Sequence, residues 1–448
     1  MKATRERLPT VDIDCIMDDI TLAGGEATLA EAVAFLTSEL GAIGLIVNNA
    51  KSCVLNGSAL ANHLGFPHPP GAKFLGAWIG SDEGAAEFMT SQLQRSRPFF
   101  ESVRNLRPEL ALPVMSRCGV PRANYAIRTH RPEISLPFAN GFDHMILDTM
   151  RAILAIPHSQ LDANSTMCIH LPLADGGLGV TSMSIIHRAA YDASVSTLLG
   201  EDAVVKQDAL TKKINAAIID GLPQELRTHL RWGRDASWIH SLRPNPHYRP
   251  AILQHIRGYT AEEVACHCGA KLPKKDLVDH ALGCTRIHGT NASSRHREVK
   301  AAIISFCHRN AIPVANEPVV YHGGIQTKRV DLRLTLPTED VFVDITIANA
   351  SCKTFVGKPL GKIESTKTKE KHAQYLEHVQ RLGGNFVTFV VEARGSLAAA
   401  ATTLTKRLQA LSILRAVPAE LRKEIQTAIA RTNGAVITNV LRPLLVLA

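Results

Sequence analysis

The sequence predicts a multidomain fold, α/β and α, on three observations. The chain has 448 residues, more than one hydrophobic core usually serves, so two or three domains are expected. Strand-like alternation of apolar and polar residues occurs near the N-terminus and again beyond residue 300. Between these regions apolar residues recur at helical spacing, which favours a helical domain.

Composition limits the location and the partners of the protein. The apolar fraction of 45% and the charged fraction of 20% are those of a globular protein. No run approaches the roughly 18 apolar residues of a membrane span, and no apolar signal follows the charged N-terminus, so we expect an intracellular protein. The net charge of +9 suits a polyanionic partner but is weak evidence alone. Most of the nine cysteines are scattered, which favours reduced thiols.

The first eighty residues predict a small α/β piece. Alternation over residues 11–23 is typical of a hairpin, with the adjacent carboxylates of Asp18 and Asp19 at its turn. Such carboxylates repel each other unless solvent or a divalent cation screens them, so a solvated turn and a metal site are both open. An amphipathic helix should follow, with apolar positions at Leu29, Val33, Leu36, Leu40 and Ile43.

The middle of the chain is predicted to be helical. Prolines mark joints between helices over residues 85–240, and the proline-rich stretch 241–250 is the predicted linker. Beyond residue 300, the order helix, strand, strand, helix, strand favours a three-layer α/β unit that ends near residue 395. Leucines at helical spacing indicate helices in the last fifty residues: Leu404, Leu408, Leu411 and Leu414.

A cluster of cysteines and histidines predicts a Zn²⁺ site. Three thiolates and an imidazole can enclose Zn²⁺ tetrahedrally, and the candidate ligands are Cys266, Cys268, His280 and Cys284. His267, His288 or His296 could replace one of them. The alternative is a set of buried cysteines beside exposed histidines. Lysines and arginines surround the cluster, which suits phosphate contacts.

Two acids in predicted strands form a second candidate site. Val330, Leu332 and Leu334 should share one strand face and leave Asp331 on the other. Asp344 is the lone acid of the apolar stretch 341–347, and a buried acid requires a partner. Neighbouring strands could place both carboxylates on one divalent cation, which would polarise a phosphodiester. A salt bridge to a nearby arginine, Arg329 or Arg333, is the competing explanation.

Several segments, in order, resemble the reverse transcriptases of non-LTR retrotransposons. Residues 16–19 resemble the aromatic-x-Asp-Asp box of the palm, 44–52 the glycine-leucine-x-x-asparagine-x-x-lysine segment, and 74–80 the leucine-glycine hairpin. Residues 118–125 and 171–179 resemble thumb and connector segments. The resemblance implies that Asp18 is a Mg²⁺ ligand with Asp19 beside it. It also implies that Lys51 lies near the departing pyrophosphate, the alternative being a solvated lysine.

The resemblance continues through the C-terminal half. The Cys/His cluster is similar to the knuckle that precedes the endonuclease of these elements, and Asp331, Asp344 and the stretch from Lys371 to Tyr375 resemble the restriction-like, PD-(D/E)XK-like nuclease itself. Thr346 occupies the usual lysine position, so the resemblance implies Lys371 as the cation, with Lys369 second. Glu317 and Glu392 are possible further acids or edge residues.

The implied organisation is an N-terminally truncated element protein. It comprises a reverse transcriptase palm remnant (1–84), a helical thumb or connector (85–245), a zinc knuckle (246–300), an endonuclease (301–395) and a helical tail (396–448). Implied cofactors are Mg²⁺ (or Mn²⁺) and Zn²⁺, implied partners are DNA and RNA, and the implied location is nuclear. Ile16 replaces the usual aromatic residue and a third metal-binding aspartate would precede Met1, so we expect DNA nicking without DNA synthesis. The alternative is a catalytically inactive nucleic-acid-binding remnant.

Overall fold

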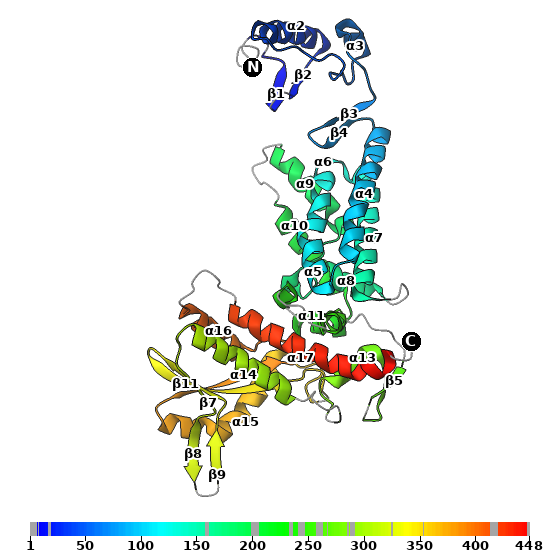
Figure 1. Cartoon of the computed structure of the whole chain (residues 1–448). Helices are drawn as coiled ribbons and strands as arrows, with labels where there is room; N and C mark the ends of the chain where they lie inside the picture. The colour runs from blue at the N-terminus through cyan, green and yellow to red at the C-terminus, as the bar shows by residue number, and fades with distance from the viewer. Residues whose placement is uncertain are drawn as a thin grey trace. The chain divides into compact units, whose positions relative to one another are not determined.

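The computed structural model describes residues 7, 9–16, 19–156, 161–198, 206–232, 236–240, 247–256, 263–266, 268–284, 286, 292–323, 326–352, 354–412 and 420–445. Within them the protein is mixed α/β, with one four-stranded sheet and four two-stranded sheets (Figure 1). The chain forms two compact units. The first comprises residues 1–96, 124–141 and 187–205, and the second comprises residues 97–123, 142–186 and 206–448.

The first unit begins with the predicted hairpin and helix, which are both confirmed. Strands β1 (Asp12–Ile16) and β2 (Asp19–Ala23) pair antiparallel, and Ala32 of helix α2 (Glu26–Ala42) joins the buried Val11 and Ile13. Ile43 was predicted to lie on this helix, but the helix ends before it and its side chain is 71% exposed. The unit continues with α3 (Ser58–Leu64), β3 (Gly71–Phe74) and β4 (Ala77–Gly80).

The predicted helical stretch is confirmed. Its α-helices are α4 (Asp82–Arg104), α5 (Pro108–Val114), α6 (Asn124–Thr129), α7 (Pro132–Leu154), α8 (Ala163–His170), α9 (Met183–Leu198), α10 (Gln207–Gly221) and α11 (Gln224–Trp232). Shorter helical segments are the π-helix η1 (Met115–Gly119) and the 3₁₀ helices η2 (Val120–Ala123), η4 (Leu173–Asp175) and η5 (Ala236–His240). Pro108 and Pro132 each begin a helix, where the missing backbone N–H removes no helical hydrogen bond.

The predicted linker is wrong in its second half. Residues 241–246 lie outside the described residues, but helix α12 (Tyr248–His255) begins within the stretch. The Tyr248 side chain is buried, and its hydroxyl donates to the backbone oxygen of Ile239 at 3.1 Å. A buried aromatic ring ties this segment to the core of the second unit, despite the prolines on either side.

The C-terminal part of the second unit contains most of the strands. In chain order its elements are β5 (Glu263–Ala265), β6 (Lys271–Pro273), α13 (Lys274–Ala281), α14 (Ala292–Arg309), β7 (Val314–Asn316), β8 (Val319–Gly323), β9 (Gln326–Arg329), β10 (Leu332–Leu336), β11 (Glu339–Ala348), α15 (Leu360–Arg381), β12 (Asn385–Glu392), α16 (Ala399–Ala410) and α17 (Glu420–Leu445). The central sheet has the order β12-β11-β10-β7. Strands β11 and β12 are parallel, and the other neighbours are antiparallel.

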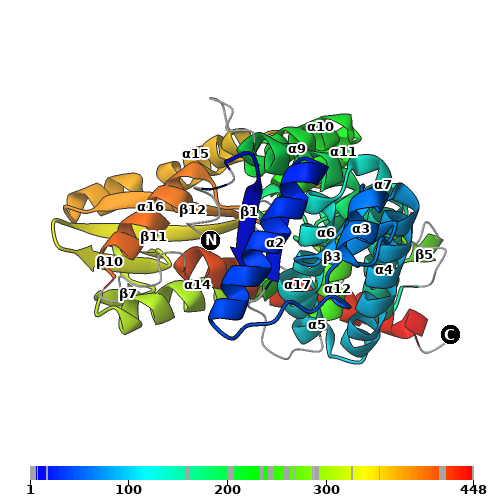
Figure 2. The same ribbon diagram turned by 90° about the horizontal axis from the view of Figure 1, so that it is seen from above.

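The central sheet lies between two helical layers, as Figure 2 shows for α15 and α14. Alternate residues of β11 point to opposite sides, which is the period of a strand. Val341, Val343 and Ile345 pack with α14, α16 and α17 in the main hydrophobic core. Phe342 packs on the other side, with residues of α15. The sequence predicted this three-layer unit but not strands β7 to β9.

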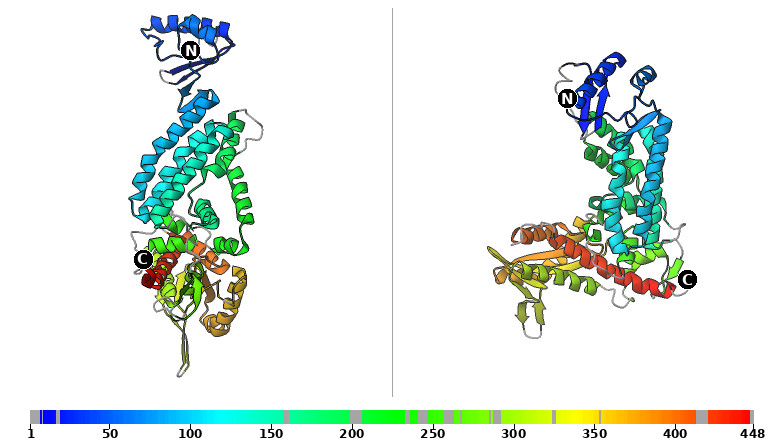
Figure 3. Two further views of the ribbon diagram at one scale, coloured as in Figure 1. Left: turned by 90° about the vertical axis from the view of Figure 1, so that its right-hand side faces the viewer. Right: turned by 45° about the horizontal axis from the view of Figure 1, so that its top comes forward.

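The predicted face pattern around Asp331 is wrong. Leu332 and Leu334 belong to the main core, whereas Val330 packs on the opposite side of the sheet with Phe342. The alternation fails because residues 330–331 connect two sheets. The chain leaves the hairpin β8–β9, which projects from the central sheet (Figure 3), and enters β10 only at Leu332. Asp331 therefore lies in a bend before the strand.

Two buried histidines stabilise the helical part of the second unit in their neutral form. The Nε2 atom of His229 lies 2.6 Å from the backbone oxygen of His255, and the Nε2 atom of His255 lies 2.7 Å from the oxygen of Gly176. Carbonyl oxygens only accept, so each Nε2 carries the proton. Burial lowers the pKa of His229 to about 3 and the pKa of His255 to about 4.

We therefore predict a loss of stability as the pH falls below about 6.5. Unfolded histidines gain protons there while the folded ones do not, so the free energy of unfolding decreases by up to about 2.7 kcal/mol per pH unit for two sites. Urea unfolding between pH 7 and 4.5 measures this slope. In a His229→Gln/His255→Gln double variant the slope over this window should be flatter. An equal slope in the two proteins would contradict the assignment.

Candidate functional site

The structure brings Asp331, in the bend just before β10, next to Asp344 of β11. In the β10–β11 register Leu332 is opposite Val343, so the two acids lie one step beyond this pair. The Oδ2 atom of Asp331 accepts the backbone N–H of Ile345 at 2.7 Å. Burial is the main cause that raises the pKa of Asp344, and the nearby charge of Asp331 raises it further.

Lys371 reaches the acid pair from helix α15. Its Nζ atom lies 2.9 Å from Oδ2 of Asp344, whose side chain is only 7% exposed. This lysine opposes the effect of burial on the pKa of Asp344. One helical turn later, the ring of Tyr375 lies with its centroid 5.7 Å from the same Nζ atom. The hydroxyl of Thr346 donates to Oδ2 of Asp344 at 3.4 Å.

Asp331 contacts a histidine that was not predicted to be its partner. The Nε2 atom of His296, on α14, lies 2.9 Å from Oδ2 of Asp331. The competing explanation required a salt bridge to a nearby arginine. Arg333 instead pairs with Asp340 at 2.5 Å, and Arg329 donates to a backbone oxygen at 3.1 Å. The partners of both acids thus come from helices, on opposite sides of the sheet.

The other candidates for this site, Glu317, Lys369 and Glu392, lie in different surroundings. The backbone N–H of Glu317 donates to the oxygen of Asp331 at 2.9 Å, while its carboxylate pairs with Lys300 at 2.7 Å. The hydrogen bond from Lys300 lowers the pKa of Glu317. Lys369 lies on α15 with an exposed side chain. Glu392 is fully buried at the end of β12, and its carboxylate accepts the backbone N–H of Ala350.

The Cys/His cluster is assembled from two loops and a helix. Cys266 and Cys268 lie in the tight connection between β5 and β6, where the backbone N–H of Gly269 donates to the oxygen of Cys266 at 2.8 Å and Gly269 has a φ of +89°. His280 lies in the last turn of α13, and Cys284 follows that helix. The four ligand atoms all lie within 4.8 Å of one another. This Cys₃His group could hold a zinc ion.

The spacing of these atoms fits Zn²⁺. Tetrahedral bonds of about 2.3 Å from zinc to sulfur place two sulfurs about 3.8 Å apart. The Sγ atoms of Cys266 and Cys284 are 3.8 Å apart, and Sγ of Cys268 lies 3.2 Å from Nε2 of His280. Burial raises the pKa of Cys266 to about 11, so binding of a metal there must displace a proton.

Of the three alternative zinc ligands, the structure describes only His296. His296 contacts Asp331 rather than the cysteines, so its expected role as a substitute ligand is wrong. The reason is that His296 lies on α14, beyond the segment that closes the Cys₃His group. His267 and His288 lie outside the described residues.

The N-terminal candidates lie in the first unit. Asp18 lies outside the described residues, and Asp19 begins β2 with an exposed side chain. Lys51 is exposed, and its backbone N–H donates to the side-chain oxygen of Asn48 at 3.2 Å.

Comparisons with protein families and with curated proteins found no match for the chain. Among the described residues, the helices are too short or too polar to cross a membrane.

We predict that the purified protein binds about one Zn²⁺ per chain at the Cys₃His group. Replacing one ligand, as in Cys284→Ser, should weaken binding at least about tenfold, because tetrahedral structural sites need all four donors. Cys352→Ser, which changes a partly buried cysteine outside the group, is the matched control. Metal content after dialysis and competition with a chromophoric chelator measure the effect. Equal zinc retention by both variants would contradict this site.

Proposed function

We propose that the C-terminal α/β part is a metal-dependent endonuclease that nicks DNA, derived from the restriction-like nuclease of a non-LTR retrotransposon. One observation carries the proposal. Asp331, Asp344 and Lys371 come from a bend, a strand and a helix, yet they meet with a lysine-to-carboxylate distance of 2.9 Å. Two carboxylates and an ammonium group at one place are suited to hydrolysis of a phosphodiester.

Each side chain has a role in this proposal. Mg²⁺ or Mn²⁺ at the two carboxylates would polarise the phosphodiester and lower the pKa of the attacking water. Lys371 stabilises the negative charge that develops on the phosphate. Tyr375 offers its ring face to the Lys371 ammonium group, which helps to fix that group. His296 orients Asp331 from α14, as partners of carboxylate ligands commonly do.

The proposal extends to the rest of the chain. Residues 1–84 are proposed to be a palm remnant, residues 85–245 a thumb or connector, and residues 246–300 a zinc knuckle that contacts DNA or RNA. The hairpins β1–β2 and β3–β4 and the helices that follow are compatible with this origin. A nuclear location follows from the same origin. RNA-directed DNA synthesis is not proposed for this chain.

A second candidate function is binding of nucleic acid without cleavage. The observation that favours it is that both acids already have cationic or potentially cationic partners within the protein, Lys371 for Asp344 and His296 for Asp331. A basic protein with an inactivated site would still bind phosphates. The two functions differ in whether Mg²⁺ produces nicks.

We predict that the protein nicks supercoiled plasmid DNA in the presence of Mg²⁺ or Mn²⁺ and that EDTA prevents nicking. Asp344→Asn should reduce the nicking rate at least about 100-fold, because it removes charge that holds the metal ion. Lys371→Met should cause a loss of similar size. Gel separation of supercoiled from open-circular plasmid measures the rate.

The matched control is Asp340→Asn. Asp340 lies on the same strand as Asp344 but pairs with Arg333 and Thr335, so this variant should nick at nearly the wild-type rate. Circular dichroism verifies that all three variants are folded. Equal nicking by Asp344→Asn and by wild type would show that a contaminant cleaves the DNA. DNA binding without nicking by wild type would favour the second function.

A further inference from the structure

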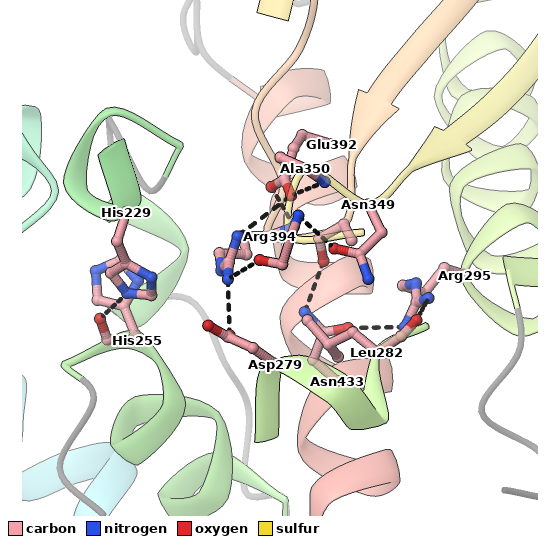
Figure 4. A network of polar contacts seen from close by, with 12 residues as sticks. His229, His255, Asp279, Leu282, Arg295, Asn349, Ala350, Glu392, Arg394 and Asn433 are labelled. Atoms are coloured by element: carbon pink, nitrogen blue, oxygen red, sulfur yellow. Dashed lines mark hydrogen bonds and ion pairs between the residues drawn. The ribbon is translucent and has the colours of Figure 1, made fainter. Parts of the chain in front are cut away.

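A network of charged side chains joins the Cys₃His segment (residues 263–266 and 268–284, which carry the Cys₃His group) to the α/β core (Figure 4). Asp279 immediately precedes the candidate ligand His280 on α13. Its Oδ1 atom lies 2.7 Å from Nη2 of Arg394, whose side chain is 9% exposed. The same Nη2 atom donates to the hydroxyl of Ser351 at 2.8 Å. Arg394 follows β12 by two residues, so this contact spans a long stretch of sequence.

Arg394 is also bound to the end of the central sheet. Its backbone N–H donates to Oε2 of Glu392 at 2.6 Å, and its Nη1 atom lies 3.5 Å from Oε1. Burial raises the pKa of Glu392, while the charge of Arg394 and backbone N–H donors, including that of Ala350, lower it. In the parallel register Glu392 is opposite Ala348 of β11, the strand that carries Asp344. Arg394 thus contacts both Asp279, which precedes the candidate ligand His280, and Glu392 at the end of the central sheet.

A second buried arginine contacts the other end of the same segment. Arg295, on α14, is 1% exposed and donates to the backbone oxygen of Leu282 at 2.5 Å. Leu282 lies between His280 and Cys284 and caps the C-terminus of α13, where carbonyl oxygens lack helical partners. Burial lowers the pKa of Arg295 to about 10, so the side chain is still charged at neutral pH.

The two arginines are linked through α17. The side-chain oxygen of Asn433 accepts from Arg295 at 3.4 Å, and its amide donates to the backbone oxygen of Ala393 at 2.8 Å. Ala393 is the residue before Arg394. The contacts therefore form a closed loop. Asp279 of α13 contacts Arg394, and Asn433 links the residue before Arg394 to Arg295. Arg295 in turn contacts Leu282 at the end of α13.

The residue after Arg295 is His296, which contacts Asp331 at 2.9 Å. Consecutive residues of one helix thus hold the segment between two metal ligands and one acid of the proposed nuclease site. Successive residues are only about 1.5 Å apart along a helix axis. A displacement of α14 at this point therefore acts on both contacts.

We propose that Arg295 and Arg394 are positioning residues that couple the Cys₃His group to the acid pair, so that metal binding at either site favours metal binding at the other. The inference rests on the proposed function for the existence of a divalent cation at the acids. Coupling of this kind is reciprocal, since each ligand must change the affinity of the other by the same factor.

The test begins with the full-length wild-type protein. Mn²⁺ binding is measured by electron paramagnetic resonance with and without one equivalent of Zn²⁺, and Asp344→Asn identifies the fraction that belongs to the acid pair. We expect Zn²⁺ to raise the Asp344-dependent Mn²⁺ affinity about tenfold. Mn²⁺ should raise the Zn²⁺ affinity, measured by chelator competition, by the same factor.

Variants then test the arginines. Arg295→Met should reduce the coupling factor to about one, and Arg394→Met should do the same. Arg297→Met is the matched control, because Arg297 lies on the same helix with an exposed side chain and should keep the wild-type factor. Arg295→Lys, which can still donate to Leu282, should recover part of the coupling.

The outcomes are distinct. Asp344-dependent Mn²⁺ binding that Zn²⁺ does not change overturns the coupling and leaves the proposed nuclease site intact. Mn²⁺ binding that Asp344→Asn does not change overturns the nuclease site, and the coupling with it. A folded Arg295→Met variant that melts at a lower temperature but keeps the wild-type factor would make the arginines merely structural and would overturn their assignment. If Arg295→Met does not fold, the wild-type reciprocity and Arg394→Met decide the question.

Discussion

The pairing of β10 with β11 is the interaction on which the rest of the C-terminal part depends. Its register sets Leu332 opposite Val343, and the apolar side chains on this face of both strands lie in the core formed with α14, α16 and α17. The same register places two acids next to each other just beyond the pair. A slip of one residue would turn these side chains to the other face, so the core and the acid pair are specified together.

Local patterns in the sequence were sufficient to predict the N-terminal hairpin and the Cys₃His group. The alternation before Asp19 and the spacing from Cys266 to Cys284 act over short stretches, and the structure has the hairpin and the Cys₃His group where they were predicted. Lys371 was predicted only from the resemblance to restriction-like nucleases, in which Thr346 stands at the usual lysine position. The predictions of the hairpin and of the Cys₃His group depend only on residues that are close together in the sequence.

The partners that come from distant segments could not be predicted. Nothing in the sequence near His296 indicates that it contacts Asp331, because the contact depends on how α14 packs over the sheet. The sequence does show an acid, Glu392, at the end of an apolar strand, and such a group demands a partner. That signal indicates that a cation is present but does not identify Arg394. The wrong assignment of Val330 has another cause, since periodicity assumes one continuous strand while the chain there passes between two sheets.

The position of α17 has a consequence for how the protein is made. Its side chains Leu421, Ile425 and Ile429 cover the sheet, and Val436, Ile437 and Val440 pack with the Cys₃His segment. A ribosome releases these residues after every strand of the sheet. The nascent chain therefore carries an apolar sheet face that only α14 and α16 can cover until residues 421–429 have been made, and apolar surface exposed during that interval favours aggregation.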